Sequence, residues 1–320
     1  MEDFELMLFD RINTIKEMNK KYDLEKNAYI SFSGGRDSTV LHHLIDMALP
    51  NNKIPRIYMN TGIEYLAITY FVKEMQKEDN RIIMISPKKH IKKVLEEKGY
   101  PFKSKEFSQL VDRFQRLGKT KSVNAFLNLN GKLACPTKLK YMFTEENKLK
   151  ISDACCKEMK EKPLDEYANK NGKTISIIGI TGGDKGRRNA FGNNGCVKKY
   201  YNQTKIYPLR VIDESFEEWF IKKYNIKLCK LYYPPYNFKR TGCKGCPFDV
   251  NLEKDLETMK MFFKNEAKQC EIIWKPVYDE YRKVKYRLKK GEEITIFDFM
   301  EEQEWFIKLL WKMNGIHFII

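Results

Sequence analysis

Residues 27–49 read Asn-Ala-Tyr-Ile-Ser-Phe-Ser-Gly-Gly-Arg-Asp-Ser-Thr-Val-Leu-His-His-Leu-Ile-Asp-Met-Ala-Leu, and this stretch decides the fold. An apolar run ends in two glycines, and apolar residues then recur at the spacing of a helix face. The pattern predicts a strand, a tight turn and a helix. Gly34 and Gly35 allow positive φ and the close approach of a ligand. Hydroxyls of Ser33 and Ser38 and the free N–H groups at the helix start favour phosphate binding.

The turn lacks the spacing Gly-x-x-x-x-Gly-Lys-Ser/Thr of the common nucleotide loop. Instead, residues 33–38 resemble the Ser-Gly-Gly-x-Asp-Ser loop of the PP-loop ATP pyrophosphatase (adenine nucleotide alpha-hydrolase-like) superfamily. The resemblance implies a loop that binds the phosphates of ATP or of an adenosine sulfonucleotide. In catalysis Arg36 would offset charge, Asp37 would orient Mg²⁺ or a hydroxyl, and Ser38 would cap the helix and touch phosphate. The implied nucleotide contacts are Ser31, Ser33, Gly34, Gly35, Arg36, Asp37 and Ser38.

The 320 residues can bury one large α/β core or two small ones. Apolar runs stay far shorter than the roughly 18 residues of a membrane span, so none is expected. The acidic start, Met-Glu-Asp-Phe-Glu, lacks the regions of a signal peptide, and we expect a cytoplasmic protein. The net charge of +16 favours a nucleotide or nucleic-acid partner, although lysines spread over most of the chain also fit a generally basic surface.

A second apolar run, residues 56–59, is followed by Asn60, Thr61, Gly62 and Glu64. Ligands bind at the carboxyl ends of strands in an open parallel sheet, so these four residues are candidate nucleotide contacts. The segment resembles the Asp-Thr-Gly loop of the phosphoadenosine phosphosulfate (PAPS) reductase family, which follows the second strand and lies near the nucleotide. Asn60 stands where the family has Asp, which removes a carboxylate from that position.

Residues 174–184 are predicted to form a buried strand that opens into another glycine turn. Two arginines follow this turn, and glycines beside guanidinium groups favour a second anionic group. The segment matches the corresponding Gly-x-x-x-x-Glu-Ser/Asp-x-x-Arg pattern of the family only loosely. The candidate contacts are Gly182, Gly183, Asp184, Arg187 and Arg188.

Eight cysteines in a chain expected in the cytoplasm favour metal ligands or reactive thiols over disulfides. Cys155 and Cys156 are adjacent, and Cys243 and Cys246 form a C-x-x-C pair. Four thiolates can bind one tetrahedral ion or one cubane cluster. Spacing alone leaves zinc, an iron–sulfur cluster and four unliganded cysteines open.

The surroundings of both pairs resemble the PAPS reductase family. Residues 155–164 are similar to its Cys-Cys-x-x-x-Lys-x-x-Pro-Leu motif, and residues 242–246 to its Gly-Cys-x-x-Cys motif. In cluster-bearing members these cysteines hold a 4Fe-4S cluster beside the nucleotide. The resemblance therefore implies such a cluster on the same four cysteines.

The end of the chain departs from the family. Assimilatory reductases carry a nucleophilic Cys in a tail of the form Glu-Cys-Gly-x-His, whereas this chain ends Lys-Met-Asn-Gly-Ile-His-Phe-Ile-Ile. Asn314 stands near the position of that thiol, so sulfonucleotide reduction would need another nucleophile. Cys135 and Cys196 are the remaining cysteines whose reactivity we would test.

The expected fold is an α/β fold with a doubly wound, mostly parallel sheet and a helical C-terminal part. We expect a nucleotide-binding α/β domain at residues 1–230 and a helical region carrying the second cysteine pair at residues 231–320. Helices are predicted at residues 2–22, 67–78, 88–98, 107–117, 252–270, 271–290 and 296–313, with another ending near residue 224. Residues 118–134 are polar and are predicted to be irregular.

The leading functional hypothesis is an enzyme that adenylates a substrate with release of pyrophosphate and uses the cluster in sulfur transfer, as in thiolation or phosphorothioation. One alternative is an APS or PAPS sulfonucleotide reductase that uses a thiol outside the tail. Another is a nucleotide-binding or nucleic-acid-binding accessory subunit. The expected partners are an adenine nucleotide, a nucleic-acid acceptor (tRNA or DNA) and a sulfur or electron donor protein, without a membrane. The oligomeric state is not predicted.

Overall fold

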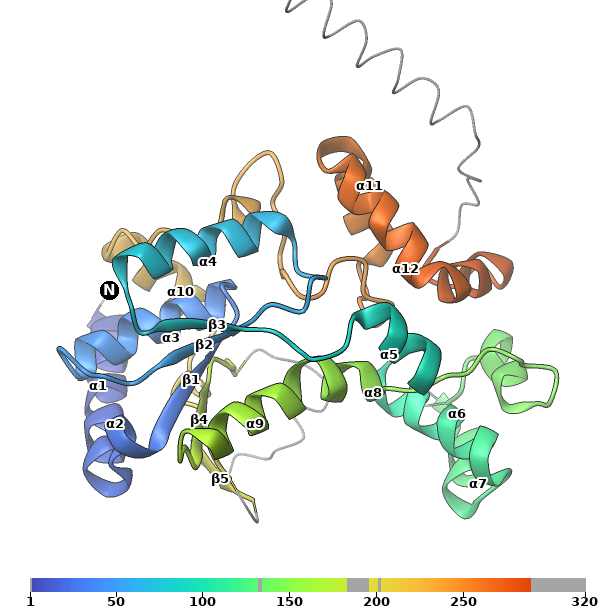
Figure 1. The fold of residues 1–320 in the computed structure, drawn as a ribbon, viewed down its shortest axis with the longest axis horizontal. Helices are drawn as coiled ribbons and strands as arrows, with labels where there is room; N and C mark the ends of the chain where they lie inside the picture. Colours follow the sequence, from blue (N-terminus) through green and yellow to red (C-terminus); the bar gives the residue numbers. More distant parts are fainter. Residues whose placement is uncertain (1, 132–133, 183–195, 201–202, 289–320) are drawn as a thin grey trace, which may run out of the picture.

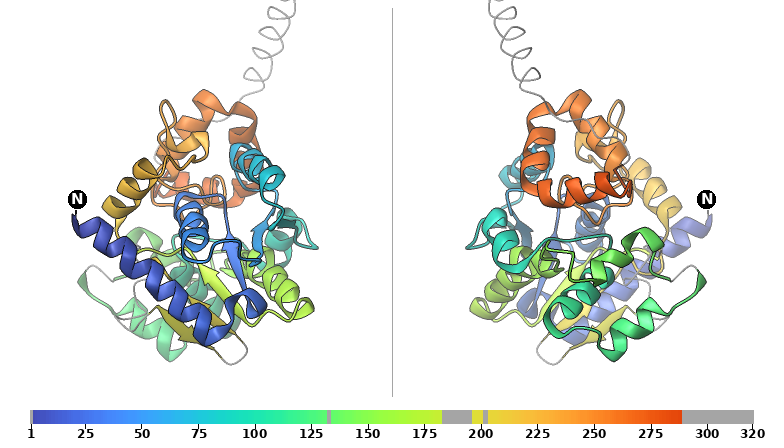
Figure 2. Two further views of the ribbon diagram at one scale, coloured as in Figure 1. Left: turned by 90° about the vertical axis from the view of Figure 1, so that its left-hand side faces the viewer. Right: turned by 90° about the vertical axis from the view of Figure 1, so that its right-hand side faces the viewer.

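The computed structural model describes residues 2–131, 134–182, 196–200 and 203–288. Within them, a six-stranded sheet with helices on both faces forms the centre of the molecule, and further helices lie beyond the carboxyl ends of the strands (Figure 1). Figure 2 shows α1 crossing one side of the molecule and the α11–α12 pair at its top. In the described ranges, no helix is long and apolar enough to cross a membrane.

The sheet follows the order β3-β2-β1-β4-β6-β5. Its strands are β1 (Ala28–Phe32), β2 (Arg56–Met59), β3 (Ile82–Ile85), β4 (Ile175–Ile178), β5 (Val197–Lys199) and β6 (Thr204–Ile206). All neighbours are parallel except β5 and β6, which pair antiparallel at one edge. The predicted doubly wound, mostly parallel sheet is therefore confirmed. The winding reverses between β1 and β4, and ligands of such sheets bind at this point, beyond the carboxyl ends of the strands.

Helices cover the two faces because alternate side chains of a strand point to opposite faces. Ala28 and Ile30 of β1 pack in a core built with α1, α3 and α10, whereas Tyr29 packs against Ala168 of α9. The helices on the first face are α1 (Glu2–Tyr22), α3 (Arg36–Ala48), α4 (Leu66–Glu78) and α10 (Glu214–Lys223), with the short α2 (Leu24–Asn27) beside them. α9 (Lys162–Lys170) covers the second face.

The remaining helices share a core with α4. They are α5 (Ile91–Lys98), α6 (Lys105–Leu117), α7 (Lys121–Leu127), α8 (Ala154–Cys156), α11 (Leu252–Phe262) and α12 (Lys264–Lys283). One cluster of buried side chains contains Val72 of α4, Phe107 of α6 and Trp274 of α12. The C-terminal helices therefore pack directly onto the α/β part, and the division at residue 230 stays a prediction.

The predicted helices are confirmed within a few residues up to α10, and two predictions differ from the structure. Residues 118–134 contain α7, because Val123 is buried and Phe126 packs against Phe107 and Phe143. The break between α11 and α12 falls at Phe263 instead of residue 270. The helical run from α8 to α9 and the β5–β6 hairpin were not predicted. The helix predicted at residues 296–313 lies outside the described residues.

A network of buried charges fixes the start of β2 against α3. Arg56 is fully buried, with its Nη2 2.6 Å from Asp46 and its Nε donating to His42 Nδ1 at 3.3 Å. Arg81 pairs with Asp46 at 2.9 Å and with Asp79 at 2.8 Å. His42, Asp46 and Asp79 lie close enough to share a cation, but the two guanidinium groups already neutralise the carboxylates. Burial, followed by the charge of Arg56, lowers the pKa of His42 to about 4, so the imidazole is a neutral acceptor.

Replacing His42 by Asn should reduce the loss of stability in mild acid. The unfolded chain binds a proton at His42 below its ordinary pKa of 6.5, whereas the folded chain does so only near pH 4. The stability contributed by the neutral imidazole is complete above pH 6.5 and is lost as the pH falls toward 4. The wild type should therefore lose about 1 kcal/mol more between pH 7.5 and 5.5 than His42→Asn in urea denaturation.

The matched control is His90→Asn, because His90 is exposed at the start of α5. This variant should keep the pH dependence of the wild type. Equal pH dependence of His42→Asn and the wild type would contradict a neutral, buried imidazole at residue 42.

Candidate functional site

The loop after β1 is closed by its own hydroxyl groups. Ser33 N donates to Ser38 Oγ at 3.2 Å, and the two serine hydroxyls are 3.0 Å apart. Ser38 Oγ also donates to the carbonyl of Gly35 at 2.9 Å. Gly35 is the N-cap of α3, so the prediction that Ser38 caps this helix is wrong, and Ser38 instead closes the loop from within the first turn. Ser31 lies inside β1, in register with Ile57 and Ile178.

The two glycines of the loop have different roles, which corrects the expectation that both use positive φ. Gly34 has a φ of +69°, and a Cβ atom there would lie 2.6 Å from Val72 of α4. Gly35 is extended, with a φ of −80°. A Cβ at Gly35 would instead lie 3.2 Å from both Ser33 Oγ and the Tyr232 hydroxyl. Gly34 is therefore required by backbone conformation and by packing, and Gly35 by space.

Two contacts that the sequence did not predict support the loop. The Tyr232 hydroxyl accepts from Arg36 N at 3.0 Å and lies 2.5 Å from Thr241 Oγ1. On the other side, a Cβ at Gly179, directly after β4, would lie 2.9 Å from the carbonyl oxygen of Asp37. The loop is thus held between the end of β4 and a segment two hundred residues later in the chain, which no local pattern could reveal.

The side chain of Arg36 reaches α10. Its Nη2 lies 2.8 Å from Glu214 and its Nε 3.3 Å from the buried Glu217. Burial alone would lower the pKa of Arg36, but the hydrogen bond to Glu214 and the charge of Glu217 raise it. The same hydrogen bond lowers the pKa of Glu214. The guanidinium charge of Arg36 is therefore already balanced by carboxylates at the edge of the loop.

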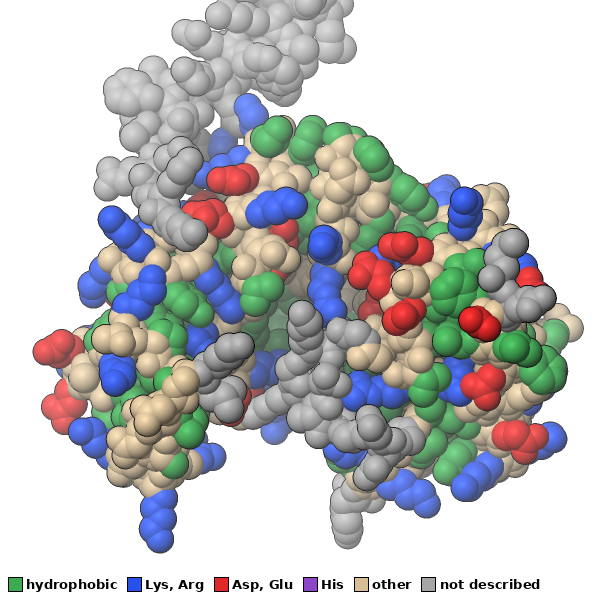
Figure 3. Space-filling model, turned by 180° about the vertical axis from the view of Figure 1, so that it is seen from behind, with side chains coloured by type: hydrophobic (Ala, Val, Ile, Leu, Met, Phe, Trp, Pro, Cys, Tyr) green, Lys and Arg blue, Asp and Glu red, His purple; other side chains and the backbone are tan. Residues whose placement is uncertain are grey.

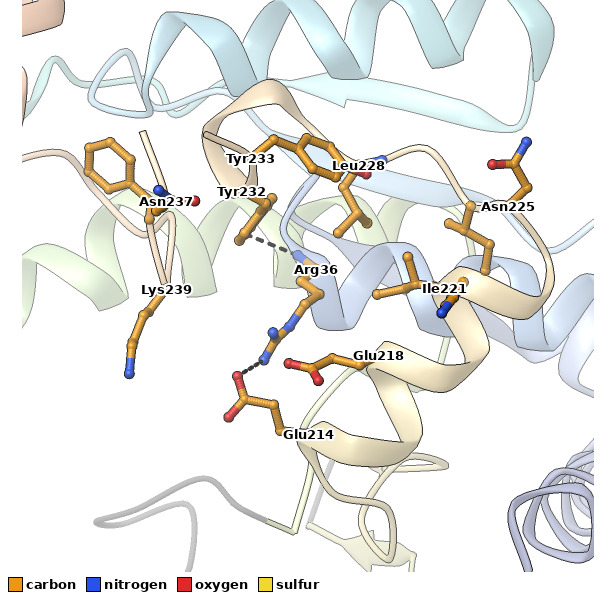
Figure 4. A pocket seen from close by; sticks show the side chains of 13 residues that line it. Arg36, Glu214, Glu218, Ile221, Asn225, Leu228, Tyr232, Tyr233, Asn237 and Lys239 are labelled. Carbon is orange, nitrogen blue, oxygen red and sulfur yellow. Dashed lines mark hydrogen bonds and ion pairs between the residues drawn. The ribbon is translucent and has the colours of Figure 1, made fainter. Parts of the chain in front are cut away.

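A pocket of about 560 Å³ opens beside Arg36 (Figure 4). It lies between α10 and the segment that carries Tyr232. Its polar lining mixes the carboxylates of Glu214 and Glu218 with the cations of Arg36 and Lys239. Such a lining suits a ligand that carries both hydrogen-bond donors and negative charge. The complete lining is Arg36, Glu214, Glu218, Ile221, Lys222, Asn225, Ile226, Leu228, Tyr232, Tyr233, Asn237, Phe238 and Lys239.

The carboxyl end of β2 forms a turn around Glu64. The Glu64 carboxylate accepts from Thr61 N at 2.9 Å and from Thr61 Oγ1 at 2.7 Å. Asn60 N donates to the carbonyl of Ile85 in the neighbouring β3, and Gly62 has a φ of +81° with open space around it. The predicted residues Asn60, Thr61, Gly62 and Glu64 therefore lie together, with Thr61 and Glu64 engaged in the turn.

The turn after β2 is joined to the C-x-x-C segment. Glu64 forms an antiparallel bridge with Cys243, and Lys244 N donates to the carbonyl of Ile63 at 2.8 Å. Lys160 lies between the two segments, because its Nζ is 3.5 Å from Glu64 and is hydrogen-bonded to Cys243. The charge of Cys243 raises the pKa of Lys160. The carboxyl end of β2 is thus in direct contact with the second cysteine pair.

The two cysteine pairs lie near enough to influence each other electrostatically. The hydrogen bond with Cys156 and burial raise the pKa of Cys155, and the charges of Cys246 and Cys243 raise it further. The hydrogen bond with Cys155 lowers the pKa of Cys156 to about 6, whereas burial raises the pKa of Cys246. The structure therefore brings together all four predicted ligands, from two segments about ninety residues apart.

The spacing of the four sulfur atoms bears on what they can hold. Within the described part of the chain, no three cysteine sulfurs lie within 4.8 Å of one another. Tetrahedral zinc, with Zn–S bonds of about 2.3 Å, would need them about 3.8 Å apart. A cubane cluster binds each thiolate at a separate iron and so separates them further. Four thiols from two segments are a donor set that suits an iron–sulfur cluster or a zinc ion.

A π-helical turn at Lys157–Glu161 follows the first cysteine pair and joins α8 to α9. Pro163 lacks the N–H that would bind the carbonyl of Met159 in an α-helix, which explains the local widening. Such turns are frequent at functional sites. Here the turn carries Lys160 toward Glu64 and Cys243.

Three aromatic donors on one face of α12 hold the second cysteine pair. Trp274 Nε1 donates to the carbonyl of Lys244 at 3.1 Å, the Tyr278 hydroxyl to Gly245 at 2.5 Å, and the Tyr281 hydroxyl to Pro247 at 2.8 Å. Gly245 has a φ of +62°, and a Cβ there would lie 2.5 Å from the Tyr278 hydroxyl. The sequence analysis missed this support, although aromatic residues at helical spacing after a C-x-x-C pair are a usable signal.

The loop after β4 is described only at its start. Gly182 N donates to the carbonyl of Ile212 at 2.9 Å, so Gly182 pairs with the segment before α10. The candidate contacts Gly183, Asp184, Arg187 and Arg188 lie outside the described residues. Asn314 of the chain end also lies outside them.

Three solved structures illustrate what the fold is similar to. PAPS reductase from Candida auris is 15% identical, with a TM-score of 0.43 over 72% of this chain and 87% of that one. FMN adenylyltransferase from Candida glabrata is 16% identical, with a TM-score of 0.42 over 75% of this chain and 62% of that one. The U34-tRNA thiolase from Methanococcus maripaludis, with its 4Fe-4S cluster, is 17% identical, with a TM-score of 0.33 over 89% and 81%.

Comparison with curated proteins gave no match. Comparison with family models gave a match of residues 27–137 to the phosphoadenosine phosphosulfate reductase domain. The matched segment contains the loop after β1, the turn around Glu64 and the third strand. The resemblance inferred from the motifs of this segment is therefore confirmed over residues 27–137, which are similar to the phosphoadenosine phosphosulfate reductase domain.

Proposed function

We propose that this chain binds ATP at residues 33–38, adenylates an acceptor with release of pyrophosphate, and transfers sulfur to that acceptor. The observation that carries the proposal is the direct contact between the nucleotide-binding sheet and the cysteines, through the Glu64–Cys243 bridge and Lys160. A site that only hydrolysed nucleotide would not need four thiols at the edge of the same sheet.

In the proposed reaction, an acceptor oxygen attacks the α-phosphate of ATP, and the bond between the α- and β-phosphates breaks to release pyrophosphate. Sulfide supplied by a donor protein then displaces AMP, which leaves with the acceptor oxygen, so sulfur takes the place of that oxygen. The N-terminus of α3 and the hydroxyls of Ser33 and Ser38 would bind the phosphates. Asp37 would orient Mg²⁺ or the attacking oxygen. Arg36, paired with Glu214, would position the phosphate loop against α10.

The cysteines Cys155, Cys156, Cys243 and Cys246 would hold a 4Fe-4S cluster, since four thiolates suit the four irons of a cubane. When bound, a cluster of this kind supplies electron transfer or activation of sulfur. Lys160 would keep a positive charge beside the thiolate of Cys243, which offsets negative charge at the site. Trp274, Tyr278 and Tyr281 would keep the second cysteine pair in place by binding its backbone carbonyls.

The net charge of +16 supports a nucleic acid, tRNA or DNA, as the acceptor. A second candidate function is sulfonucleotide reduction, which the match to the PAPS reductase domain favours. The two functions differ in their products. Anaerobic incubation with ATP and nucleic acid should release pyrophosphate, whereas APS or PAPS with a thiol reductant should release no sulfite. If sulfite is released and pyrophosphate is not, the adenylation proposal is refuted and sulfonucleotide reduction takes its place.

Anaerobically purified protein should be brown, with broad absorption near about 400 nm and about four irons per chain. Ser in place of Cys155, Cys156, Cys243 or Cys246 should remove most of this absorption, because each thiolate would bind a separate iron. Iron analysis and ultraviolet–visible spectra measure the effect.

The control is Cys270→Ser, because Cys270 is buried on α12 next to Gly245 and is not a proposed ligand. This variant should keep the colour. A colourless anaerobic wild type that contains one zinc per chain would refute the cluster.

Gly179→Ala should weaken ATP binding by at least about tenfold, or about 1.4 kcal/mol. The added Cβ would lie 2.9 Å from the carbonyl oxygen of Asp37, so the phosphate loop must shift. Isothermal titration with ATP measures the change, and circular dichroism checks that the protein stays folded.

Gly242→Ala is the matched control, because a Cβ there meets nothing within 4 Å although the residue lies next to Cys243. It should bind ATP like the wild type. Unchanged ATP affinity in Gly179→Ala would show that residues 33–38 do not form the phosphate site.

A further inference from the structure

The positive charge of the chain is concentrated in one segment. Residues 86–162, named here the basic lobe, hold 19 Lys and Arg against 9 Asp and Glu, a net charge of +10 in 77 residues. The other 243 residues share a net charge of +6. If the positive charge were spread evenly along the chain, each segment would carry a net charge in proportion to its length. The basic lobe carries more than this share of the net charge.

The basic lobe is one packed unit beyond the carboxyl ends of the strands. Its two ends are joined where Tyr100 pairs with Ile151, with Tyr100 N donating to Lys150 O at 2.8 Å. Phe107 and Phe143 pack against each other inside it. Figure 1 shows α5–α8 standing apart from the sheet, and Figure 3 shows Lys and Arg side chains spread over this part and along the hollow beside it.

Many lysines of the basic lobe have no carboxylate partner. Lys89 pairs with Glu97, and Lys162 pairs with Glu158. By contrast, six exposed lysines form no ion pair within the part of the chain that the structure describes: Lys92, Lys93, Lys98, Lys119, Lys121 and Lys140. Their charges are available to an external anion.

The same lobe carries the first cysteine pair. Cys155 and Cys156 lie in α8, which packs against α5. Lys105 and Lys160 add positive charge near Cys156. A polyanion on the surface of α5 would therefore lie beside the four cysteines. Among the exposed large hydrophobic residues described, only Leu117 and Leu129 belong to the lobe, which is too few to anchor it in a membrane interface.

We propose that the basic lobe is the docking surface for the phosphate backbone of the nucleic acid that accepts sulfur. This inference rests on the proposed function, since it names where the acceptor binds. Lysines on several helices suit successive phosphates, and contacts of this kind position a nucleic acid without reading its sequence. Binding should consequently depend steeply on salt, because each neutralised phosphate releases counterions.

The test compares two triple variants that remove the same charge. Lys92→Gln/Lys93→Gln/Lys98→Gln changes α5 of the basic lobe. Lys16→Gln/Lys21→Gln/Lys26→Gln changes exposed lysines of α1 and α2, at the opposite end of Figure 1. Fluorescence anisotropy with pooled tRNA and with a short DNA duplex gives the dissociation constant over a range of salt concentrations.

The lobe variant should bind at least about tenfold more weakly at low salt, and its slope of log Kd against log salt should fall by about 2. The α1–α2 variant should stay within about twofold of the wild type. The tighter of the two probes identifies the acceptor. Equal losses in both variants, or displacement of the probe by polyglutamate or anionic vesicles as readily as by nucleic acid, would overturn the proposal.

A separate readout keeps the two proposals distinguishable. ATP-dependent pyrophosphate release, measured at saturating nucleic acid, should be the same in both triple variants. If neither the wild type nor the variants release pyrophosphate, but only the lobe variant loses nucleic-acid binding, the docking surface is supported and the adenylation proposal is refuted. If pyrophosphate is released and the lobe variant binds nucleic acid like the wild type, only the docking surface is refuted.

Discussion

The backbone bridge between Glu64 and Cys243 is the constraint on which the rest of the site depends. It attaches the C-x-x-C segment to the turn at the end of β2, and Lys244 N extends the pairing to the carbonyl of Ile63. Backbone hydrogen bonds therefore set the distance between the cysteines and the sheet. The Glu64 carboxylate makes two contacts at this junction. It accepts a hydrogen bond from Thr61, which closes the turn, and it pairs with Lys160.

Buried charges make this junction sensitive to the loss of any member. Lys244 and Glu266 are both almost fully buried, with Lys244 Nζ 3.3 Å from the carboxylate. Glu266 also accepts from Leu66 N at the start of α4, so one carboxylate connects α12, α4 and the cysteine segment. Removing one partner of a buried pair leaves an uncompensated charge, which costs about 3–5 kcal/mol. The C-terminal helices are therefore part of the frame of the site.

Arg36 joins the loop at residues 33–38 to α10. A Lys ammonium at this position would be a compact point charge. The planar fork of Arg36 instead reaches Glu214 and Glu217 together, which ties the start of α3 to α10. Arg36 and Glu214 line the pocket that also contains Tyr232. The loop and the pocket thus share a residue whose charge is balanced within the protein.

Local patterns in the sequence were enough to predict β1, β2 and β4 and the loop at residues 33–38. The strand, glycine turn and helix at residues 27–49 follow from apolar period and backbone freedom, and β2 and β4 follow from short apolar runs. The sequence also named the four cysteines, since adjacent and C-x-x-C spacings are visible in one dimension.

Which groups meet depends on how the sheet and the helices pack. The roles of Tyr232 and Gly179 at the loop of residues 33–38 depend on segments far away in the chain, which periodicity cannot report. Helix α7 forms in a polar stretch because Phe126 packs on Phe143, so packing outweighs composition there. Gly34 and Gly35 look alike in the sequence. In the structure, Gly34 has a positive φ that other residues rarely adopt, whereas a side chain at Gly35 would lie close to the Tyr232 hydroxyl. Local backbone preferences and apolar spacing determine which segments form helices and strands. The site is determined by contacts between distant residues, because those contacts exist only once the sheet and helices have packed.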